Sequence, residues 1–407
     1  MINCKKCLYN ETHPLGLEFD DNGVCSGCII HEEKNQIIWD ERMVELQRLV
    51  NQYRSKRNLN YDCIVPVSGS GDSYFILHMI KNILKLRPLL VTYNKYFNTP
   101  LGIRNLSNLR TKFDCDILIQ NVNPDSVKKI TKITLGRLGS IYWHCIAGST
   151  VFPVQTAVRY KIPLIIWGAH QGIEQVGMFS HTDNVEMTRR YRKDHDLMGY
   201  EADDLLSTFE SISEEHIWQY RYPSDTEIQD IGVRGIYLNN YIRWDPKKQH
   251  EKMIELYNYE TAKFSRSFET YDHVDCYNYL NLHDYIKYIK HGYSKVTDHA
   301  NREIRHGRIT RSEASNLVRF YQNNEYGYNE LFLKWLGLNK DSLDFVIDQF
   351  RNKKFWLEYE PKKWKLIKQD NETLSVKNEL KKLNFITNSE INRGKKSAYI
   401  TIGKGYP

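Results

Sequence analysis

The stretch YDCIVPVSGSGDS, residues 61–73, places a short apolar run directly before a turn of glycines and serines, and a helical pattern follows it. A buried strand, a glycine-rich turn and a helix N-terminus together form an anion site, because free backbone N–H groups and the helix dipole converge there. The serines offer hydroxyl donors, and the glycines let the backbone approach a phosphate. The predicted phosphate-binding residues are Ser68, Gly69, Ser70, Gly71, Asp72 and Ser73.

Asp72 is the one member of this turn that would repel a bare phosphate. Its presence predicts a magnesium ion that bridges the carboxylate and the phosphate oxygens. No lysine follows in the spacing G-x-x-x-x-G-K-[ST], so an ordinary P-loop NTPase is excluded.

Outward from this turn, apolar runs alternate with amphipathic segments of helical length. Such an alternation predicts an α/β fold with a parallel sheet covered on both faces, whose ligands bind at the carboxyl ends of the strands. The predicted strands are 61–67, 88–93, 116–122 and 163–167, and the predicted helices are 74–86, 101–113, 124–138 and 149–160. Residues 31–56 read as one linking helix. The region 173–245 is less periodic and is a candidate substrate surface, and the remainder reads as mainly helical.

Four of the eight cysteines stand apart near the start of the chain, in a C-x2-C pair, a gap of seventeen residues and a second C-x2-C pair. In a reducing compartment this spacing favours a tetrahedral zinc site over two disulfides. Four thiolates leave no open position for water, so the zinc is predicted to be structural. The predicted ligands are Cys4, Cys7, Cys25 and Cys28.

Composition bounds the remaining choices. The chain has 407 residues, 41% of them hydrophobic, and a formal net charge of +7, which is an ordinary globular composition. The apolar runs are too short to span a bilayer and no signal-peptide pattern is seen, so a soluble cytoplasmic protein without a membrane partner is expected. The expected domains are a zinc module over 1–35, an α/β domain over 36–245 and a helical substrate or partner region over 246–407.

The turn resembles the S-G-G-x-D-S pyrophosphate loop of the PP-loop ATP pyrophosphatases, which cleave ATP between its α- and β-phosphates. The resemblance implies a parallel-sheet domain of the adenine nucleotide α-hydrolase (HUP) type, with ATP and Mg2+ as cofactors. Ser70 stands where that family usually has its second glycine, and a serine fits if this position does not need a positive φ. The resemblance also implies that Thr92 and Tyr93 hold adenine and that Gly168 contacts ATP.

A wider resemblance covers most of the chain. The cysteine pairs, the turn, the segment 167–172 and the stretch 290–314 look like the N-acetyl sugar amidotransferases of surface polysaccharide and of pseudaminic- or legionaminic-type nonulosonic acid biosynthesis. That resemblance implies conversion of a sugar acetamido group to an acetamidino group, with ATP and with ammonia from a separate HisH-like glutaminase. Ala169 and His170 depart from the Glu-Asn of many relatives, so contacts of that carboxylate are not carried over.

The chemistry needs cations where charge develops on the phosphates. With the resemblance, the predicted catalytic residues are Asp72, Lys290 and Arg305. The predicted substrate-binding residues are His170, Gln171, Glu174, Tyr293, His299, Arg302 and Arg308. The spacing of Arg302, Arg305 and Arg308 by three predicts a shared helix face. On spacing alone a solvated basic face is favoured, and only the family resemblance reverses that preference.

Two other functions fit parts of the sequence. A PP-loop tRNA thiolase also pairs zinc knuckles with such a turn, but it usually carries two cysteines near the third helix, where Cys145 stands alone in the sequence. A zinc-knuckle RNA-binding protein is the non-enzymatic alternative, with tyrosines as stacking platforms. Nucleic acid is the less favoured partner, because the tyrosines are dispersed and the net charge is mild.

Overall fold

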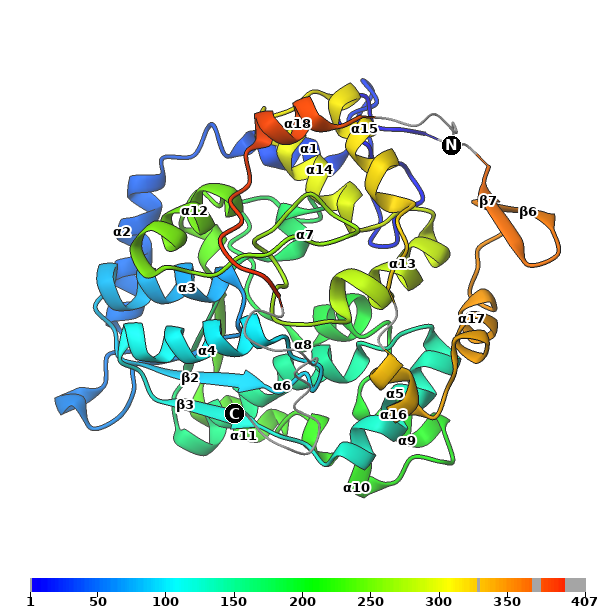
Figure 1. Ribbon diagram of the computed structural model, residues 1–407. Coiled ribbons are helices and arrows are strands. Elements are labelled where there is room, and N and C mark those ends of the chain that lie inside the picture. The colour runs from blue at the N-terminus through cyan, green and yellow to red at the C-terminus, as the bar shows by residue number, and fades with distance from the viewer. Residues whose placement is uncertain (1, 328–329, 368–374, 392–407) are drawn as a thin grey trace.

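A computed structural model describes residues 2–327, 330–367 and 375–391 (Figure 1). Its centre is a five-stranded sheet in the order β3-β2-β1-β4-β5, in which every neighbouring pair is parallel. The strands are β1 (Cys63–Pro66), β2 (Pro88–Tyr93), β3 (Ile117–Gln120), β4 (Leu164–Trp167) and β5 (Arg234–Tyr237). The predicted α/β fold with a parallel sheet is confirmed.

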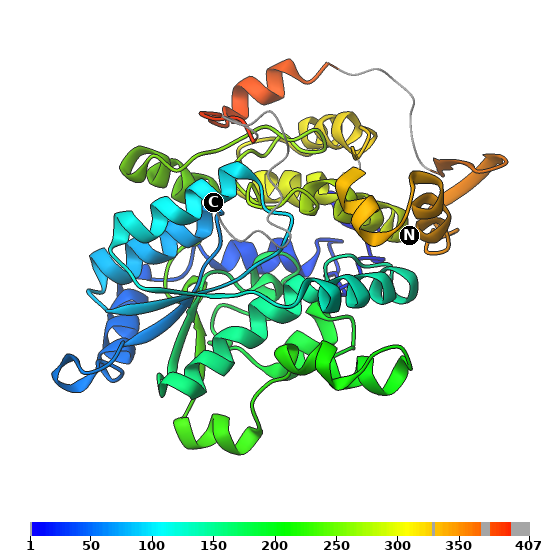
Figure 2. The ribbon, with the colours of Figure 1, turned by 60° about the horizontal axis from the view of Figure 1, so that its bottom comes forward.

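Both faces of this sheet are buried, as the continuous apolar runs require. Along β1, Cys63 and Val65 pack into one core and Ile64 into another, because successive side chains of a strand point to opposite faces. Figure 2 shows the sheet between the two helical layers. The first core contains residues of α2 (Trp39–Asn51), α3 (Gly71–Leu77), α4 (Pro100–Phe113) and α12 (Pro246–Tyr257), and the second contains residues of α6 (Trp143–Tyr160) and α11 (Asp225–Ile231).

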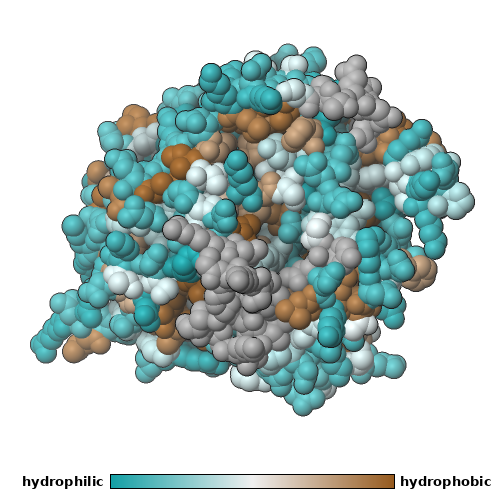
Figure 3. All heavy atoms as spheres, viewed as in Figure 1, coloured by the Kyte–Doolittle hydropathy of each residue, from teal (hydrophilic) through white to brown (hydrophobic). Residues whose placement is uncertain are grey.

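Beyond the sheet the chain is mostly helical. In the sequence, β3 is followed by α5 (Pro124–Leu138). Between β4 and β5 the chain forms α7 (Gln171–Glu174), α8 (Arg189–Tyr191), α9 (Ala202–Thr208) and α10 (Glu214–Ile217). The last third holds α13 (Asp284–His291), α14 (Lys295–Arg305), α15 (Arg311–Gln322), α16 (Glu330–Leu336), α17 (Lys340–Asp348), the hairpin β6 (Trp356–Glu360) and β7 (Lys363–Leu366), and α18 (Lys377–Leu383). No helix in the described ranges has the length and apolarity to span a bilayer. The face of the protein surface shown in Figure 3 is mostly hydrophilic, with small apolar patches.

The structure differs from the expected elements in four places. The single helix expected over 31–56 is wrong: it is split into α1 (Ser26–Glu33) and α2, because the chain turns inward at Lys34, whose carbonyl accepts hydrogen bonds from Trp39 and Arg243. The fifth strand, β5, lies in the region expected to be irregular. Helix α6 begins at Trp143 rather than at residue 149. Helix α14 ends at Arg305, so Arg308 lies beyond it, after Gly307 with φ +69°.

Candidate active site

Three cavities follow one another at the carboxyl edge of the sheet, where the fold places ligands. The first lies between the ends of β1 and β2 and the start of α4, and it shares Lys95 and Ser149 with the second. The second, of about 410 Å³, shares Ala169, Gln171 and Lys295 with the third, of about 230 Å³. The three therefore form a continuous row between the sheet and the carboxyl-terminal helices.

The turn after β1 is held by its own hydroxyl groups. The Ser68 N–H donates to Ser73 Oγ at 2.8 Å, and the Oγ atoms of Ser68 and Ser70 are also 2.8 Å apart. Ser70 is the N-cap of α3 with φ −100° and ψ 165°, which is extended backbone open to any residue. The serine in place of the usual glycine is thus accommodated without strain.

The two glycines of the turn are required by close packing. A Cβ at Gly69 would lie 2.2 Å from the carbonyl oxygen of Gly102 on α4. A Cβ at Gly71 would lie 2.6 Å from Cδ2 of His250 on α12. The turn can therefore hold this shape only with glycine at both positions, because any side chain would push it away from a neighbouring helix.

Asp72 meets a buried histidine that sequence analysis did not single out. His250 is fully buried, and its Nε2 lies 2.9 Å from Asp72 Oδ1, while its Nδ1 lies 3.6 Å from Asp272 Oδ1. Burial lowers the pKa of His250, but the hydrogen bond to Asp72 and the charge of Asp272 outweigh it, so the pKa is raised. His250 therefore bridges two carboxylates that come from distant parts of the chain.

Arg302 completes this network from α14. Its Nη1 lies 2.9 Å from Asp272 Oδ2. Burial alone raises the pKa of Asp272, yet Arg302 and His250 outweigh it and hold that pKa well below its usual range. His250 and Asp272 lie in stretches with no motif, on a helix face and in a loop, so only their position after folding could reveal them.

The third cavity collects most of the predicted catalytic and substrate residues. Its walls include residues from the turn, from the segment after β4 and from α14. The predicted residues among them are Ser70, Asp72, Gln171, Glu174, His299, Arg302 and Arg305. Several further wall residues were not predicted from the sequence, namely Tyr9, His31, Trp244, Asp272, His273 and Lys295. Segments more than 200 residues apart thus form one polar cavity.

Glu174 and His170 are fixed by neighbours. The Glu174 carboxylate lies 2.5 Å from the Nζ of Lys34, which is 1% exposed, and accepts a hydrogen bond from Asn239 at 3.1 Å. His170 lines the second cavity and caps α7, since its Nδ1 accepts the Gly172 N–H at 3.1 Å. Burial lowers the pKa of His170 to about 3, so its ring is neutral near pH 7.

Three of the predicted catalytic and substrate-binding residues do not line the cavity row. Lys290 on α13 donates from Nζ to the carbonyl of Leu138 at 2.9 Å, and burial lowers its pKa. Tyr293 packs against Tyr9. Arg308 pairs with Asp245, and because it lies beyond the end of α14 it does not share a helix face with Arg302, which corrects that expectation.

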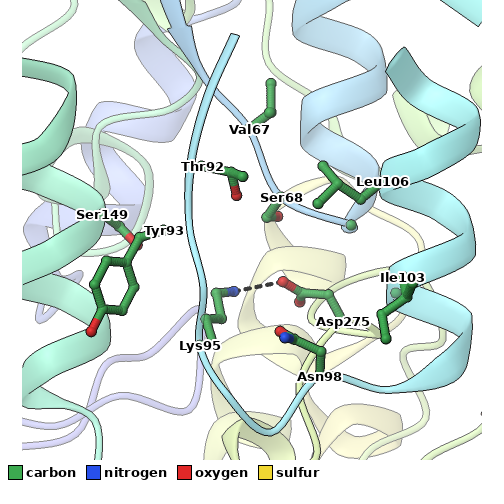
Figure 4. A pocket seen from close by; sticks show the side chains of 12 residues that line it. Val67, Ser68, Thr92, Tyr93, Lys95, Asn98, Ile103, Leu106, Ser149 and Asp275 are labelled. Atoms are coloured by element: carbon green, nitrogen blue, oxygen red, sulfur yellow. Dashed lines mark hydrogen bonds and ion pairs between the residues drawn. The ribbon is translucent and has the colours of Figure 1, made fainter. Parts of the chain in front are cut away.

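The pair of residues expected at adenine lies at the first cavity (Figure 4). Thr92 and Ser68 point towards it, and Lys95 and Asp275 join across it at 2.7 Å. Tyr93 turns towards α6, where its hydroxyl lies 3.0 Å from His144 Nδ1. The cavity is about 30 Å³, which is room for a few water molecules, so an adenine ring would fit only if the cavity widened. Gly168 lies in the second, larger cavity.

The four cysteines of the amino-terminal module fit a structural zinc ion. All four are buried, and their Sγ atoms lie within 4.8 Å of one another. Backbone N–H groups of Lys6, Cys7 and Cys25 point at Cys4 Sγ at 3.3–3.4 Å, which stabilises a thiolate. The donor set and its burial are those of a closed tetrahedral site.

Arg305 connects this cysteine cluster to the third cavity. Its Nη1 donates to the carbonyls of Glu174 and Gln175 at 3.1 and 2.8 Å, and its Nη2 lies 3.9 Å from Cys25 Sγ. On the same side, the Tyr9 hydroxyl donates to Asp298 at 2.7 Å. The amino-terminal cysteine module therefore contributes Tyr9 and His31 to the wall of the third cavity, and Arg305 contacts both this module and the segment after β4.

Comparisons with known proteins match parts of the chain. Residues 251–370 match the family described as LPS biosynthesis protein WbpG-like, C-terminal domain. This range supplies Asp272, Lys295 and Arg302 to the third cavity. An uncharacterized protein of Methanocaldococcus jannaschii is 22% identical over 120 residues, which cover 30% of this chain and 43% of that relative.

Among solved structures, an NH3-dependent NAD synthetase from Campylobacter jejuni in complex with the nitrate ion is similar, at 11% identity and with a TM-score of 0.27. The match covers 48% of this chain and 95% of that one. The chain spans less than half the length of the curated relative from Methanocaldococcus jannaschii.

Proposed function

We propose that the protein is an ATP-dependent amidotransferase that converts an N-acetamido group of a sugar to an acetamidino group. The observation that carries the proposal is the third cavity, in which Ser70 and Asp72 of the phosphate-type turn face Gln171, Glu174 and Arg302. A triphosphate at the turn would thus lie beside a polar wall suited to a polyhydroxylated substrate. The match of residues 251–370 to a family of LPS biosynthesis supports a sugar substrate.

The reaction balances as two displacements. The amide oxygen attacks the α-phosphorus of ATP and pyrophosphate leaves; ammonia then adds at the amide carbon, and AMP leaves with the former amide oxygen. Adenylation is needed because an amide carbonyl is a poor electrophile and its oxygen a poor leaving group. The sugar is N-acetylated, and the ammonia is proposed to come from a separate HisH-like glutaminase.

The residues divide this work between them. The turn and the start of α3 would hold the pyrophosphate, and Asp72 would hold magnesium, which neutralises phosphate charge when bound. Arg302, kept in place by Asp272, presents its charge to the same cavity. His299 accepts or donates a hydrogen bond as a neutral ring, because burial lowers its pKa to about 3. Lys290 has no contact with this cavity and is not assigned a step.

The test is incubation of the purified protein with ATP, magnesium, ammonium and a panel of N-acetylated nucleotide sugars and nonulosonic acids. Mass spectrometry should show exchange of oxygen for NH in one sugar, together with AMP and pyrophosphate. The Asp72→Asn variant should abolish both products. AMP formed without any change in a sugar would contradict the proposed acceptor, and a lack of nucleotide cleavage with every sugar would contradict the proposed chemistry.

One observation favours a second candidate, the tRNA thiolase. Cys145, which stands alone in the sequence, packs in a buried cluster with Cys276 and lines the second cavity. Burial raises the pKa of the Cys145 thiol well above its usual range, however, and a protonated thiol is a poor nucleophile. Cys145→Ser and Cys276→Ser separate the candidates, since an amidotransferase should keep its activity in both variants whereas a thiolase should lose it.

A further inference from the structure

A fourth cavity lies apart from the row at the sheet edge. Its volume is about 820 Å³, and none of its wall residues belongs to the other three. It is formed where α13, the end of α15, the start of α17 and the β6–β7 hairpin meet, and Figure 1 shows this hairpin projecting from the body of the protein. All of its wall residues lie within the range that matches the LPS biosynthesis family.

Aromatic rings dominate the wall of this cavity. Six of them come from three segments that are distant in the sequence: α13, the stretch after α15 and the β6–β7 hairpin. They are Tyr285, Tyr288, Tyr326, Trp356, Tyr359 and Trp364. Tyr285 and Tyr326 stack with ring centroids 4.2 Å apart, and the Arg351 guanidinium lies over both Trp356 and Trp364 at 4.7 and 5.1 Å. These four rings are therefore held in place by packing before any ligand arrives.

A bulge aims one of these rings into the cavity. In a regular strand Trp356 and Tyr359, three residues apart, would point to opposite faces. The register of β6 against β7 shifts between Glu358 and Glu360, and both rings line the same cavity. Bulges that re-aim a side chain in this way are common next to binding sites.

Two buried donors in the wall have no hydrogen-bond partner within the described ranges. One is Nη2 of Arg266, a residue that is 1% exposed, and the other is the indole Nε1 of Trp364. The rest of the Arg266 guanidinium is fixed, with Nε on Asp284 at 2.7 Å and Nη1 on the carbonyl of Gln322 at 3.1 Å. Leaving such donors unpaired costs free energy, so an acceptor oxygen of a ligand that reached either donor would be stabilised.

The charges of the wall select a neutral ligand. Arg266 is paired with Asp284 and Lys340 with Asp344, while Glu325 adds a negative charge and Lys365 a positive one. The wall together with its ion-pair partners therefore carries no net charge, which fits a neutral ligand better than a phosphate. The side chains of Gln322, Asn323 and Asn324 add amide groups, which donate and accept hydrogen bonds.

We propose that this cavity is a binding site for a neutral pyranose oligosaccharide, separate from the reaction cavity. Ring faces cover the apolar C–H faces of a pyranose, and amides and orphaned N–H donors match its hydroxyl groups. Such a site would hold a growing or acceptor glycan on the domain that resembles LPS biosynthesis proteins. It does not require the proposed amidotransferase activity.

The test is titration of the full chain with chitotriose and with maltotriose, in which binding is measured by tryptophan fluorescence and by isothermal titration calorimetry. We expect one of these sugars to bind, and Tyr359→Ala to weaken it about tenfold by removal of one stacking ring. Tyr359 is 52% exposed, so its loss should not unfold the protein, and Leu357→Ala is the matched control, because Leu357 is 51% exposed on the same strand and outside the wall. Trp364→Phe, which removes the indole N–H and keeps a ring, should also weaken binding.

Three outcomes would overturn the proposal. The first is the absence of a binding signal from either sugar at millimolar concentration. The second is binding of adenosine, titrated in parallel, in place of the sugars, which would indicate a base-stacking site. Sugar binding that survives Tyr359→Ala but is lost in Asp72→Asn would assign the sugar to the reaction cavity. Failure of ATP cleavage with intact sugar binding would leave this site standing and remove only the proposed activity.

Discussion

The buried ion pair between Lys34 and Glu174 gives the sharpest prediction. Lys34 Nζ lies 2.5 Å from the Glu174 carboxylate and 3.2 Å from the carbonyl of Trp244. The substitution Lys34→Met keeps the apolar stem and removes the charge. Breaking a buried pair costs about 3–5 kcal/mol, because the remaining charge is left without compensation. The Glu174 side chain is 18% exposed and keeps its hydrogen bond from Asn239 in the variant. Because both lower the cost, we expect a loss of about 2–3 kcal/mol in the free energy of unfolding.

The assay is a double-mutant cycle with Glu174→Gln, measured by urea unfolding and tryptophan fluorescence. If the two charges stabilise each other, the double variant should recover about 1.5–3 kcal/mol relative to the sum of the single losses. Lys6→Met is the control, because Lys6 and Glu32 form an exposed pair, and its cost should stay below about 1 kcal/mol. A coupling energy below about 0.5 kcal/mol for the buried pair would refute the reasoning.

Three further predictions concern the amino-terminal cysteine module and the third cavity. Cys7→Ser should lose the bound zinc, measured by atomic absorption, and should lower the rate of AMP formation because Arg305 loses its support; full activity in a zinc-free variant would contradict this. Arg302→Gln should reduce AMP formation about 10- to 1000-fold, whereas Arg308→Gln, outside the third cavity, should change it by less than about threefold. Equal losses in the two variants would argue against the third cavity as the place of the reaction. Since the pKa of His250 is raised, its protonated form stabilises the fold fully below about pH 6.5, and this contribution is lost as the pH rises through the raised value. The difference in unfolding free energy between the wild type and His250→Gln should therefore shrink from pH 6 to pH 9, and a constant difference would contradict it.

The sheet and the turn after β1 could be predicted because their signals are local. Four apolar runs of strand length, each followed by a helical period, are enough to predict a parallel sheet. Strand β5, with the sequence RGIY, contains an arginine and a glycine in four residues and has no such signal. The break after α1 depends on a tertiary contact, since Lys34 turns inward to reach Glu174.

The candidate site was harder to predict than the fold. Asp72 and Arg302 could be proposed from motifs and from a family resemblance, because each lies in a stretch with a recognisable pattern. His250 and Asp272 have no pattern of their own, and they reach Asp72 only after α12 packs on α3. Spacing by three placed Arg308 with Arg302, but Gly307 ends the helix between them, which no count of residues reveals.

The turn after β1 separates what packing requires from what a ligand requires. Gly69 and Gly71 are explained by the carbonyl of Gly102 and the ring of His250, so their presence would be needed even in a protein that bound no phosphate. Packing does not explain Asp72. Its side chain, at the start of α3, is 44% exposed at the third cavity, and the buried His250 holds its carboxylate. Burying an ionisable histidine is costly and contributes little to a core, so the arrangement makes sense where the carboxylate must be held in one orientation. Asp72 is thus the residue of the turn that packing alone does not explain, and its substitution tests the site when the free energy of unfolding is measured alongside, because the variant also loses the hydrogen bond to His250.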